Sequence, residues 1–318
     1  MLIDPVNLPP QGAIVFVDKA PDWTSHDVVA KARRTLGTRK VGHAGTLDPM
    51  ATGLLVLGAG PATRLLTHLV GLDKTYTTTI RLGISTVTDD REGDRLVTAS
   101  GAEVARVAAD PDRIAAAVAR LTGPIEQAPS AVSAIKVDGQ RAYDRVRAGE
   151  EVELKARPVT IHAFHIGPPR LTHTDDGVSV IDIEATVRCS TGTYIRALAR
   201  DLGADLGIGG HLVALRRTEV GPFRVTESTP IAELADGRVR ALESPASIAR
   251  KLFPVLEMTA DETRDLAHGK RFEVAASRCA DAKLVAAIAP DGRLVGLIEI
   301  KRGRTRVVTN FPWQEENA

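Results

Sequence analysis

The sequence predicts an α+β fold in which helices flank a mixed or antiparallel central sheet. Residues 76–82 and 179–189 alternate in polarity and are rich in β-branched side chains, a pattern that favours strands. Residues 112–121 have the spacing of a helix that ends at Gly123-Pro124. Gly58-Ala59-Gly60 opens no dinucleotide-binding βαβ unit, because the third glycine of that pattern would fall on Thr63. No motif in the chain indicates a nucleotide cofactor.

The other elements are predicted in order along the chain. Thr24-Ser25 offers an N-cap for a helix over 26–36, which Gly37 ends, and Thr193 is expected to cap a helix over 194–206. Residues 124–158 are expected to form an exposed hairpin and a short helix near Tyr143. The remaining expectations are strands at 12–19, 54–58 and 211–220, a helical segment after Pro61, and a charged loop through about residue 252.

The end of the chain has its own pattern. One helix over 260–267 and strands over 283–289 and 294–300 predict a small, separate α/β unit that ends on basic residues. A length of 318 residues is sufficient for two domains. We therefore expect domains at 1–250 and 251–318, with 124–158 as an insertion in the first.

Charge and cysteine content narrow the class of protein. The formal net charge is only +1, yet basic side chains gather within 28–47, 188–217 and 301–306. Such local patches on a nearly neutral protein indicate a polyanionic partner. The only two cysteines, Cys189 and Cys279, lack metal or redox spacing, so we expect reduced thiols in a cytoplasmic protein. No segment has the pattern of a signal peptide or a membrane span.

Residues 40–53 are the most unusual stretch, with three glycines, His43 and Asp48 in fourteen residues. So many glycines predict a bent loop rather than a helix or a regular strand. Pro49 keeps Asp48 out of the helical region of backbone conformation. From these residues alone, Asp48 is either a turn residue that satisfies its own backbone or a positioned chemical group.

A second acidic stretch lies at residues 86–94, with Asp89, Asp90, Glu92 and Asp94. The spacing could suggest calcium, but the glycine and glutamate positions of an EF-hand loop do not follow. We expect no metal site here.

Several blocks in order make the chain resemble the TruB-type tRNA pseudouridine synthases. The main block comprises residues 42–49 and Ala51-Thr52-Gly53. Further matching blocks follow in the family's order, and the resemblance as a whole covers about residues 12–225. The other matching residues are Asp73-Lys74-Thr75-Tyr76, Leu82-Gly83, Thr86, Thr88, Asp90, Gly93, Pro129, Ser133-Ala134, Lys136, Ala156-Arg157-Pro158, Gly192-Thr193-Tyr194-Ile195-Arg196 and Leu215-Arg216-Arg217. The chain departs from the family at Lys19-Ala20-Pro21-Asp22, where Lys-Pro-x-Gly is usual, and at Val132, where tyrosine is common.

The resemblance implies a fold and an activity. It implies the pseudouridine synthase fold for 1–250, with 124–158 as a thumb-like insertion, and an abbreviated PUA-like RNA-binding domain for 251–318. The implied enzyme is an isomerase, an intramolecular transferase, that converts uridine 55 in the T-loop of tRNA to pseudouridine. Base flipping, glycosidic cleavage, rotation of uracil and C5–C1′ bond formation involve no net redox change, so no cofactor or metal is expected.

The resemblance also implies roles for the carboxylate and its partner. Asp48 is the implied catalytic residue, either as nucleophile at C1′ or as base at C2′. Arg196 is its implied partner, because a guanidinium favours the ionised form of an enclosed carboxyl group. The alternative for Arg196 is a surface residue on the first turn of a helix, where a cation opposes the helix dipole.

Four further residues are expected in the same site on the strength of the resemblance. Tyr76 is the implied stacking platform for the flipped base, since stacking is worth about 1–3 kcal/mol per base. Tyr194 would lie against the sugar and act in proton transfer at C5. Leu215 would form an apolar wall, and His43 would occupy the space that the flipped base leaves.

The expected partner is the T-arm of tRNA, with no protein partner, no membrane and a monomeric chain. Two other functions stay open: a tRNA-binding folding chaperone that acts without catalysis, and a guide-RNA-dependent paralogue. The side chains expected to hold RNA phosphates are Arg39, Lys40, Lys136, Arg141, Arg157, Arg216 and Arg217.

Overall fold

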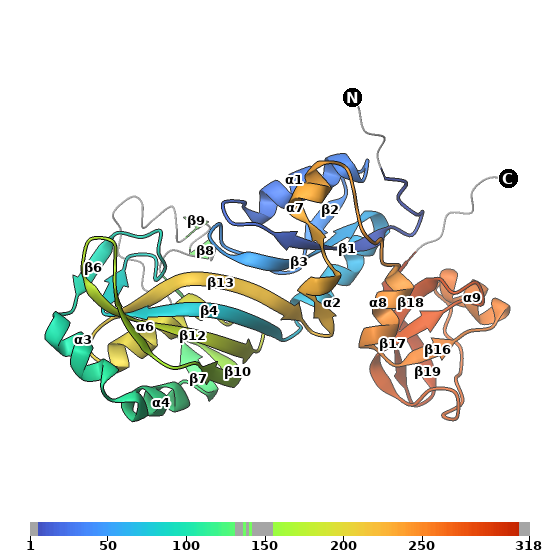
Figure 1. The fold of residues 1–318 in the computed structure, drawn as a ribbon. Helices are drawn as coiled ribbons and strands as arrows, with labels where there is room; N and C mark the ends of the chain where they lie inside the picture. The colour runs from blue at the N-terminus through green and yellow to red at the C-terminus, as the bar shows by residue number, and fades with distance from the viewer. Residues whose placement is uncertain (1–5, 131–135, 138–139, 142–154, 312–318) are drawn as a thin grey trace. The chain divides into compact units, whose positions relative to one another are not determined.

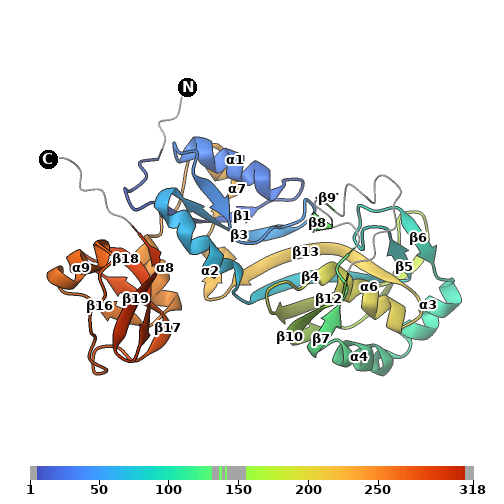
Figure 2. The same ribbon diagram turned by 180° about the vertical axis from the view of Figure 1, so that it is seen from behind.

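The computed structural model describes residues 6–130, 136–137, 140–141 and 155–311. The chain divides into two compact units, and we describe each by itself. Unit 1 comprises residues 1–49, 53–70 and 222–318, and unit 2 comprises 50–52 and 71–221. Figures 1 and 2 show the chain from opposite sides. The helix expected near Tyr143 lies outside the described residues.

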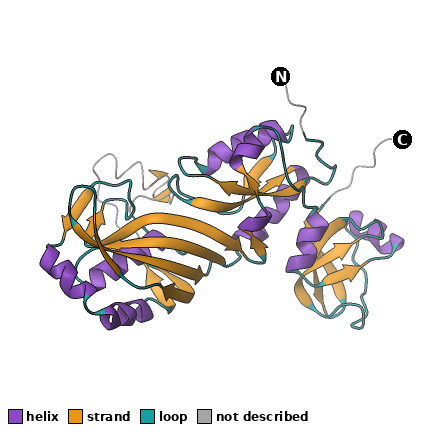
Figure 3. Cartoon of the chain, in the orientation of Figure 1, coloured by secondary structure: helices purple, strands orange, loops and turns teal. Residues whose placement is uncertain are grey.

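Unit 2 is built on an antiparallel sheet, which confirms the predicted fold class. In spatial order its strands are β13 (Gly210–Val220), β4 (Lys74–Leu82), β12 (Ser179–Cys189), β10 (Arg157–Ile166) and β7 (Gly123–Gln127). All neighbouring strands are antiparallel, and β11 (Arg170–His173) also pairs with β12. In Figure 3 these strands are orange. The alternating sequence pattern predicted β4 and β12, and β13 was also predicted as a strand.

Among the described residues of unit 2, three helices accompany this sheet: α3 (Gly101–Ala108), α4 (Pro111–Arg120) and α6 (Ile195–Asp205). Ser100 and Glu103 form a capping box that starts α3, a local signal that the sequence analysis did not use. Helix α6 packs against β13 and β4, and its buried residues include Leu198 and Leu202. A Cβ at Gly203 would lie 2.1 Å from the carbonyl carbon of Gly209, so only glycine lets helix and strand approach this closely.

Short strands complete unit 2. Strand β5 (Ile84–Thr86) pairs with β6 (Arg95–Thr98), so the loop predicted over 86–94 joins a hairpin. Strands β8 (Lys136–Val137) and β9 (Gln140–Arg141) form the second hairpin, in the region where one was expected.

In unit 1, β1 (Ala13–Lys19) pairs with β15 (Thr229–Pro230) in parallel and with β3 (Thr52–Ala59) antiparallel. Strand β2 (Val41–His43) pairs with β3. Helix α1 (Ser25–Thr35) begins at Thr24, whose hydroxyl accepts the Asp27 N–H, as the N-cap prediction requires. The segment after Pro61 is a 3₁₀ turn (Gly60–Leu65) and then α2 (Leu66–Val70).

Residues 225–252 are not a loop, and this prediction is wrong. They contain α7 (Ile231–Ala235) and α8 (Pro245–Leu252), and Ser244 caps α8. The stretch also contains a 3₁₀ turn (Val225–Glu227) and β15, and β14 (Phe223–Arg224) directly precedes it. Charged residues such as Asp236, Arg238 and Arg240 lie between the two short helices, so the composition of the whole stretch hid them.

The last part of the chain forms a four-stranded sheet. Its order is β16 (Val255–Glu257), β17 (Ala282–Ile288), β18 (Leu294–Lys301) and β19 (Arg304–Asn310). Helix α9 (Ala260–Ala267) has the predicted bounds and contacts β18. Buried Leu256, Leu266, Val285 and Ile298 belong to one apolar core, consistent with a C-terminal α/β unit.

Candidate active site

The glycine-rich stretch is a loop that closes a hairpin. Its first residues are strand β2, in which His43 lies opposite Leu57 of β3, so the expectation of an irregular chain over all of 40–53 is wrong at its ends. The Ala44 N–H extends the ladder by donating to Val56 O at 2.9 Å. Gly45 has φ +90°, which a residue with a Cβ rarely adopts. The loop that carries Asp48 therefore begins and ends on paired strands.

The backbone just after Asp48 is fixed by a buried lysine. Lys19, at the end of β1, is 0% exposed, and its ammonium group donates to three carbonyl oxygens. These belong to Ala20 at 3.0 Å, Trp23 at 2.6 Å and Pro49 at 3.0 Å. Asp48 is half-buried, and the buried Lys19 of unit 1 fixes the backbone of the residue that follows it. From the sequence, Lys19 was predicted only as the last residue of a strand over 12–19.

Asp22 stands where the family usually has glycine, and it takes a conformation that glycine favours. Its φ is +64°, a region in which aspartate is one of the few tolerated residues with a side chain. Its N–H donates to Pro49 O at 3.0 Å, the oxygen that Lys19 also contacts. The departure from Lys-Pro-x-Gly therefore leaves a turn that still contacts the Asp48 loop.

His43 lies half-buried on the same loop, next to a second histidine. The ring of exposed His26, on the first turn of α1, meets the His43 ring edge-on at 5.9 Å between centroids and 80° between planes. The sequence analysis did not single out His26. Its only signal was its place directly after an N-cap sequence, which does not reveal what lies beside it.

Tyr76 and Leu215 share one face of the sheet in unit 2. Tyr76 lies opposite Arg217, and Leu215 lies opposite Thr78, two residues further along β4. Side chains two apart on a strand point to the same face, so these four lie together. Tyr76 is 9% exposed and Leu215 is 7% exposed. The structure thus brings two of the predicted site residues together.

Tyr194 is held by a buried amide side chain. Gln127, at the end of β7, accepts the Tyr194 N–H at 2.8 Å and donates to Tyr194 O at 3.1 Å. Tyr194 is itself the N-cap residue of α6, so the predicted cap by Thr193 is wrong. The Thr193 hydroxyl instead donates to Ser190 O at 3.0 Å. Gln127 was not predicted, because a glutamine at a strand end has no distinctive sequence pattern.

Arg196 is buried at 5% exposure, so it is not a surface residue of α6. Its Nη1 donates to Thr88 O at 2.8 Å and forms an ion pair with Asp90 at 3.2 Å. Asp90 also accepts the Thr88 hydroxyl at 2.5 Å. The predicted need of Arg196 for an anion is met by a carboxylate of the 86–94 loop. Pairing of Arg196 with Asp48 stays a prediction.

A second ion pair joins α6 to the same loop. Arg200, one turn after Arg196, lies 3.2 Å from Asp89 and donates to Ala128 O at 2.8 Å. Burial raises the pKa of the Asp89 carboxyl group, and the Arg200 charge opposes that rise. Acidic residues that first suggested calcium therefore serve as partners for two arginines of α6.

Lys74 lies two residues before Tyr76 and is 7% exposed. Its ammonium group donates to Leu72 O at 2.6 Å and to the Thr191 hydroxyl at 3.3 Å. Burial, helped by the positive charge of Arg217, lowers the pKa of Lys74 to about 8.

The shift at Lys74 predicts that stability increases with pH. Because the folded-state pKa lies near 8 and the unfolded value near 10.5, the unfolded chain binds more protons between these values. The unfolding free energy of the wild type should therefore rise by about 1 kcal/mol between pH 7.5 and 9 relative to Lys74→Met. Urea titrations of both proteins measure the difference, and parallel pH curves would contradict the shift. Burial raises the pKa of Cys189 to about 11, and because both proteins contain this thiol its titration contributes to both pH curves.

The residues expected to hold RNA phosphates differ in exposure. Arg39 and Lys40 of unit 1 and Arg157 of unit 2 are exposed, and Arg216 is half-buried. Arg217 is 1% exposed within unit 2, and its expected contact with a phosphate stays a prediction. Lys136 and Arg141 lie opposite each other in the β8–β9 hairpin.

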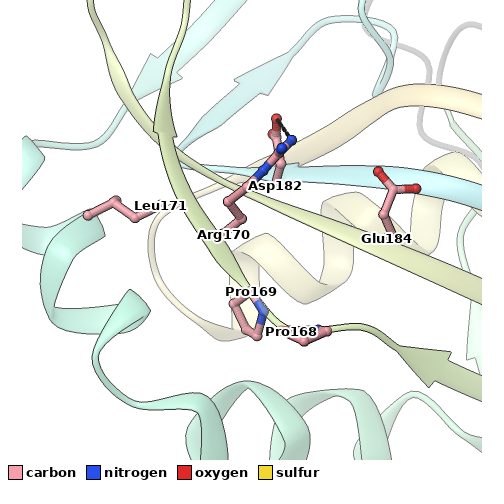
Figure 4. A pocket seen from close by; sticks show the side chains of 6 residues that line it. All are labelled: Pro168, Pro169, Arg170, Leu171, Asp182 and Glu184. Carbon is pink, nitrogen blue, oxygen red and sulfur yellow. Dashed lines mark ion pairs between the residues drawn. The ribbon is translucent and has the colours of Figure 1, made fainter.

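A groove elsewhere on unit 2 contains none of the predicted site residues. Its lining consists of Pro168, Pro169, Arg170, Leu171, Asp182 and Glu184 (Figure 4). The Arg170 guanidinium lies 3.9 Å from the Asp182 carboxylate, and Glu184 lies further along β12. Asp182 also binds Arg81 through two contacts of 2.8 Å. Its carboxylate is therefore engaged within the protein.

Solved structures share this fold. One is described as "Structure of H/ACA RNP bound to a substrate RNA containing 2'-deoxyuridine"; it is 21% identical, with a TM-score of 0.66, and the match covers 99% of this chain and 92% of that chain. A Cbf5-Nop10-Gar1 complex is 23% identical with the same TM-score of 0.66, covering 98% and 92%. The fold is that of the pseudouridine synthases, and at these identities the likeness shows the fold alone.

Sequence comparison is more specific. The family model "TruB family pseudouridylate synthase (N terminal domain)" matches residues 33–195. Models of the "tRNA Pseudouridine synthase II, C terminal" and "tRNA pseudouridylate synthase B C-terminal domain" match 253–312 and 196–258. The protein named tRNA pseudouridine synthase B of Leifsonia xyli subsp. xyli is 55% identical, covering 95% of this chain and 97% of its own. That of Thermobifida fusca is 50% identical, covering 94% and 98%. The chain belongs to the TruB family of pseudouridylate synthases.

Within the described ranges, no helix is both long enough and apolar enough to cross a membrane.

Proposed function

We propose that this chain is a tRNA pseudouridine-55 synthase that isomerises a uridine of the T-loop. The observation that carries the proposal is its 55% identity, over 95% of its length, to a protein named tRNA pseudouridine synthase B. The loop that carries Asp48 is also built as a positioned element rather than an isolated turn. Its strand pairing and the contacts of Lys19 favour a chemical role for the carboxylate.

Asp48 is the catalytic group of this proposal. It acts at the ribose of the flipped uridine, as nucleophile at C1′ or as base at C2′, and Arg196 favours its ionised form. Tyr76 stacks on the base and Leu215 closes an apolar side; both are buried on one sheet face, as a base-binding surface requires. Tyr194 contacts the sugar and takes part in proton transfer at C5. His43 fills the vacated space in the RNA.

Affinity for tRNA comes from phosphate contacts. Exposed Arg39, Lys40 and Arg157, with Arg216, are the described basic side chains of this set, and Lys136 and Arg141 join them on the β8–β9 hairpin. The C-terminal four-stranded unit adds RNA contacts in this proposal. The chain acts as a monomer in the cytoplasm, without a protein partner, metal or cofactor.

The test uses purified protein alone and an unmodified tRNA transcript. We expect stoichiometric pseudouridine at position 55, read by carbodiimide-stop sequencing, and no product from a transcript with cytidine there. Failure to modify the transcript without a guide RNA or partner would overturn the proposal in favour of a guide-dependent paralogue.

A chaperone that remodels tRNA without catalysis is the second candidate. It is favoured only by the exposed basic side chains, which either function needs. Complementation of a strain lacking the protein by an Asp48→Asn variant separates the two roles, because a chaperone would still restore tRNA folding.

Tyr76→Leu should retain tRNA affinity within about tenfold while turnover falls much further. The stacking energy is gained only once the base has flipped, so its loss acts on the reactive state. Single-turnover kinetics and filter binding measure the two quantities. Unchanged turnover in Tyr76→Leu would remove Tyr76 from the site.

A further inference from the structure

The backbone just before Asp48 is held by one buried hydroxyl group. Ser25 Oγ accepts the N–H of Leu47 at 2.9 Å and donates to the carbonyl oxygen of Leu47 at 3.1 Å. The N–H and the carbonyl oxygen of Leu47 therefore share one hydrogen-bond partner. Ser25 is 1% exposed, so water does not substitute for it.

Ser25 is in turn placed by the start of α1. Thr24 caps this helix: its hydroxyl accepts the Asp27 N–H at 3.1 Å, and Asp27 accepts the Thr24 N–H at 2.9 Å. This reciprocal capping box fixes the first turn, on which Ser25 is the first residue. The Ser25 hydroxyl is therefore held in a fixed position next to the loop.

We propose that Ser25 is a positioning residue for the reaction, acting through Leu47 on the carboxylate of Asp48. Ser25 holds Leu47 on one side of Asp48, and Lys19 holds Pro49 on the other at 3.0 Å. A loop fixed on both sides keeps its central carboxylate in one place without touching it. The inference rests on the proposed catalytic role of Asp48.

Loss of the hydroxyl should affect rate more than affinity. Without it, the buried N–H and carbonyl of Leu47 lack their partner, and the loop shifts to satisfy them. A shift of about 1 Å at a reacting group can cost about 10²-fold in rate. Ser25 has no route to RNA through its buried side chain, so tRNA affinity should stay within about threefold.

Thr35 offers a matched control on the same helix. Its hydroxyl is also buried, at 7% exposure, and donates to the Leu234 carbonyl oxygen at 2.7 Å. Thr35→Val removes a buried hydroxyl and leaves a carbonyl without its partner, as Ser25→Ala does. Thr35 differs from Ser25 in its position, because it lies at the other end of α1, away from the Leu47 segment.

The experiment compares Ser25→Ala, Thr35→Val and the wild type in single-turnover kinetics, tRNA binding and thermal unfolding. We expect Ser25→Ala to slow the chemical step about 10- to 100-fold, with unchanged affinity, and Thr35→Val to stay within twofold. A rate for Ser25→Ala within threefold of wild type, or equal losses in both variants, would overturn the proposal.

Ser25→Cys keeps the side-chain shape with a somewhat larger atom in place of the hydroxyl oxygen, and the thiol weakens both hydrogen bonds. It is expected to give an intermediate rate, and it replaces Ser25→Ala in the comparison if that variant does not fold. Wild-type kinetics for Ser25→Cys would count against the proposal in the same way. If Asp48→Asn remains active, the proposed catalytic role fails instead, so the two failures are distinguishable.

Discussion

Asp48→Asn is expected to reduce pseudouridine formation by at least about 10³-fold while leaving the fold and tRNA binding intact. The amide is neither a nucleophile at C1′ nor a base at C2′, so both versions of the mechanism lose their reacting group. The contacts that hold this loop bind backbone atoms of Leu47 and Pro49, so replacement of the Asp48 side chain does not remove them. Single-turnover assays with excess enzyme measure the loss.

Asp22→Asn is the matched control for this result. Asp22 is exposed, lies on the turn that contacts the same loop, and donates to Pro49 O through its backbone. Asparagine also tolerates the positive φ at this position, so activity should stay within about twofold. Activity of Asp48→Asn above a tenth of the wild-type value would show that the carboxylate is not the reacting group.

Arg196→Met should be the most destabilising change in the predicted site, raising the free energy of the folded state by about 3–5 kcal/mol. The side chains of Arg196 and Asp90 are 6% and 4% exposed, so loss of the guanidinium leaves a buried carboxylate without its cation. Activity should fall with it, because α6 then holds the Thr88–Asp90 segment only through the ion pair of Arg200 with Asp89. Urea unfolding and single-turnover kinetics give the two effects.

A double variant separates the ion pair from the activity. Asp90→Asn keeps the shape and the oxygen that accepts the Thr88 hydroxyl, but it removes the charge. Arg196→Met with Asp90→Asn should be about 1–3 kcal/mol more stable than the sum of the single variants, yet remain inactive. Simple additivity would mean that the pair at 3.2 Å contributes no coupling.

Long periodic segments were predictable because a single local pattern decides them. The strands of 179–189 and 211–220 and the helix of 260–267 were found within one residue of their bounds. Shorter elements were missed: β16 is three residues long and α7 is five. Their stability comes from neighbours distant in sequence, which local propensity does not report.

The site residues that could be predicted from the sequence are those that lie in a family motif. Asp48, Tyr76 and Arg196 were selected by resemblance, whereas Ser25 and Gln127 act on backbone atoms of residues 22 and 67 positions away. A hydroxyl or amide that binds a distant backbone leaves no pattern at its own position. Arg217 shows the converse, since its arginine identity suggested a phosphate contact that its burial does not favour.

The pairing of β13 with β4 restricts how this chain can diverge. Irregularities between Leu212 and Ala214 and between Arg217 and Glu219 bracket the short run that carries Leu215 opposite Thr78. A substitution there changes one side chain, but a one-residue deletion between them would move Leu215 to the opposite face from Tyr76. Homologues should therefore vary in residue type along this run while keeping its length, with insertions displaced to the turns.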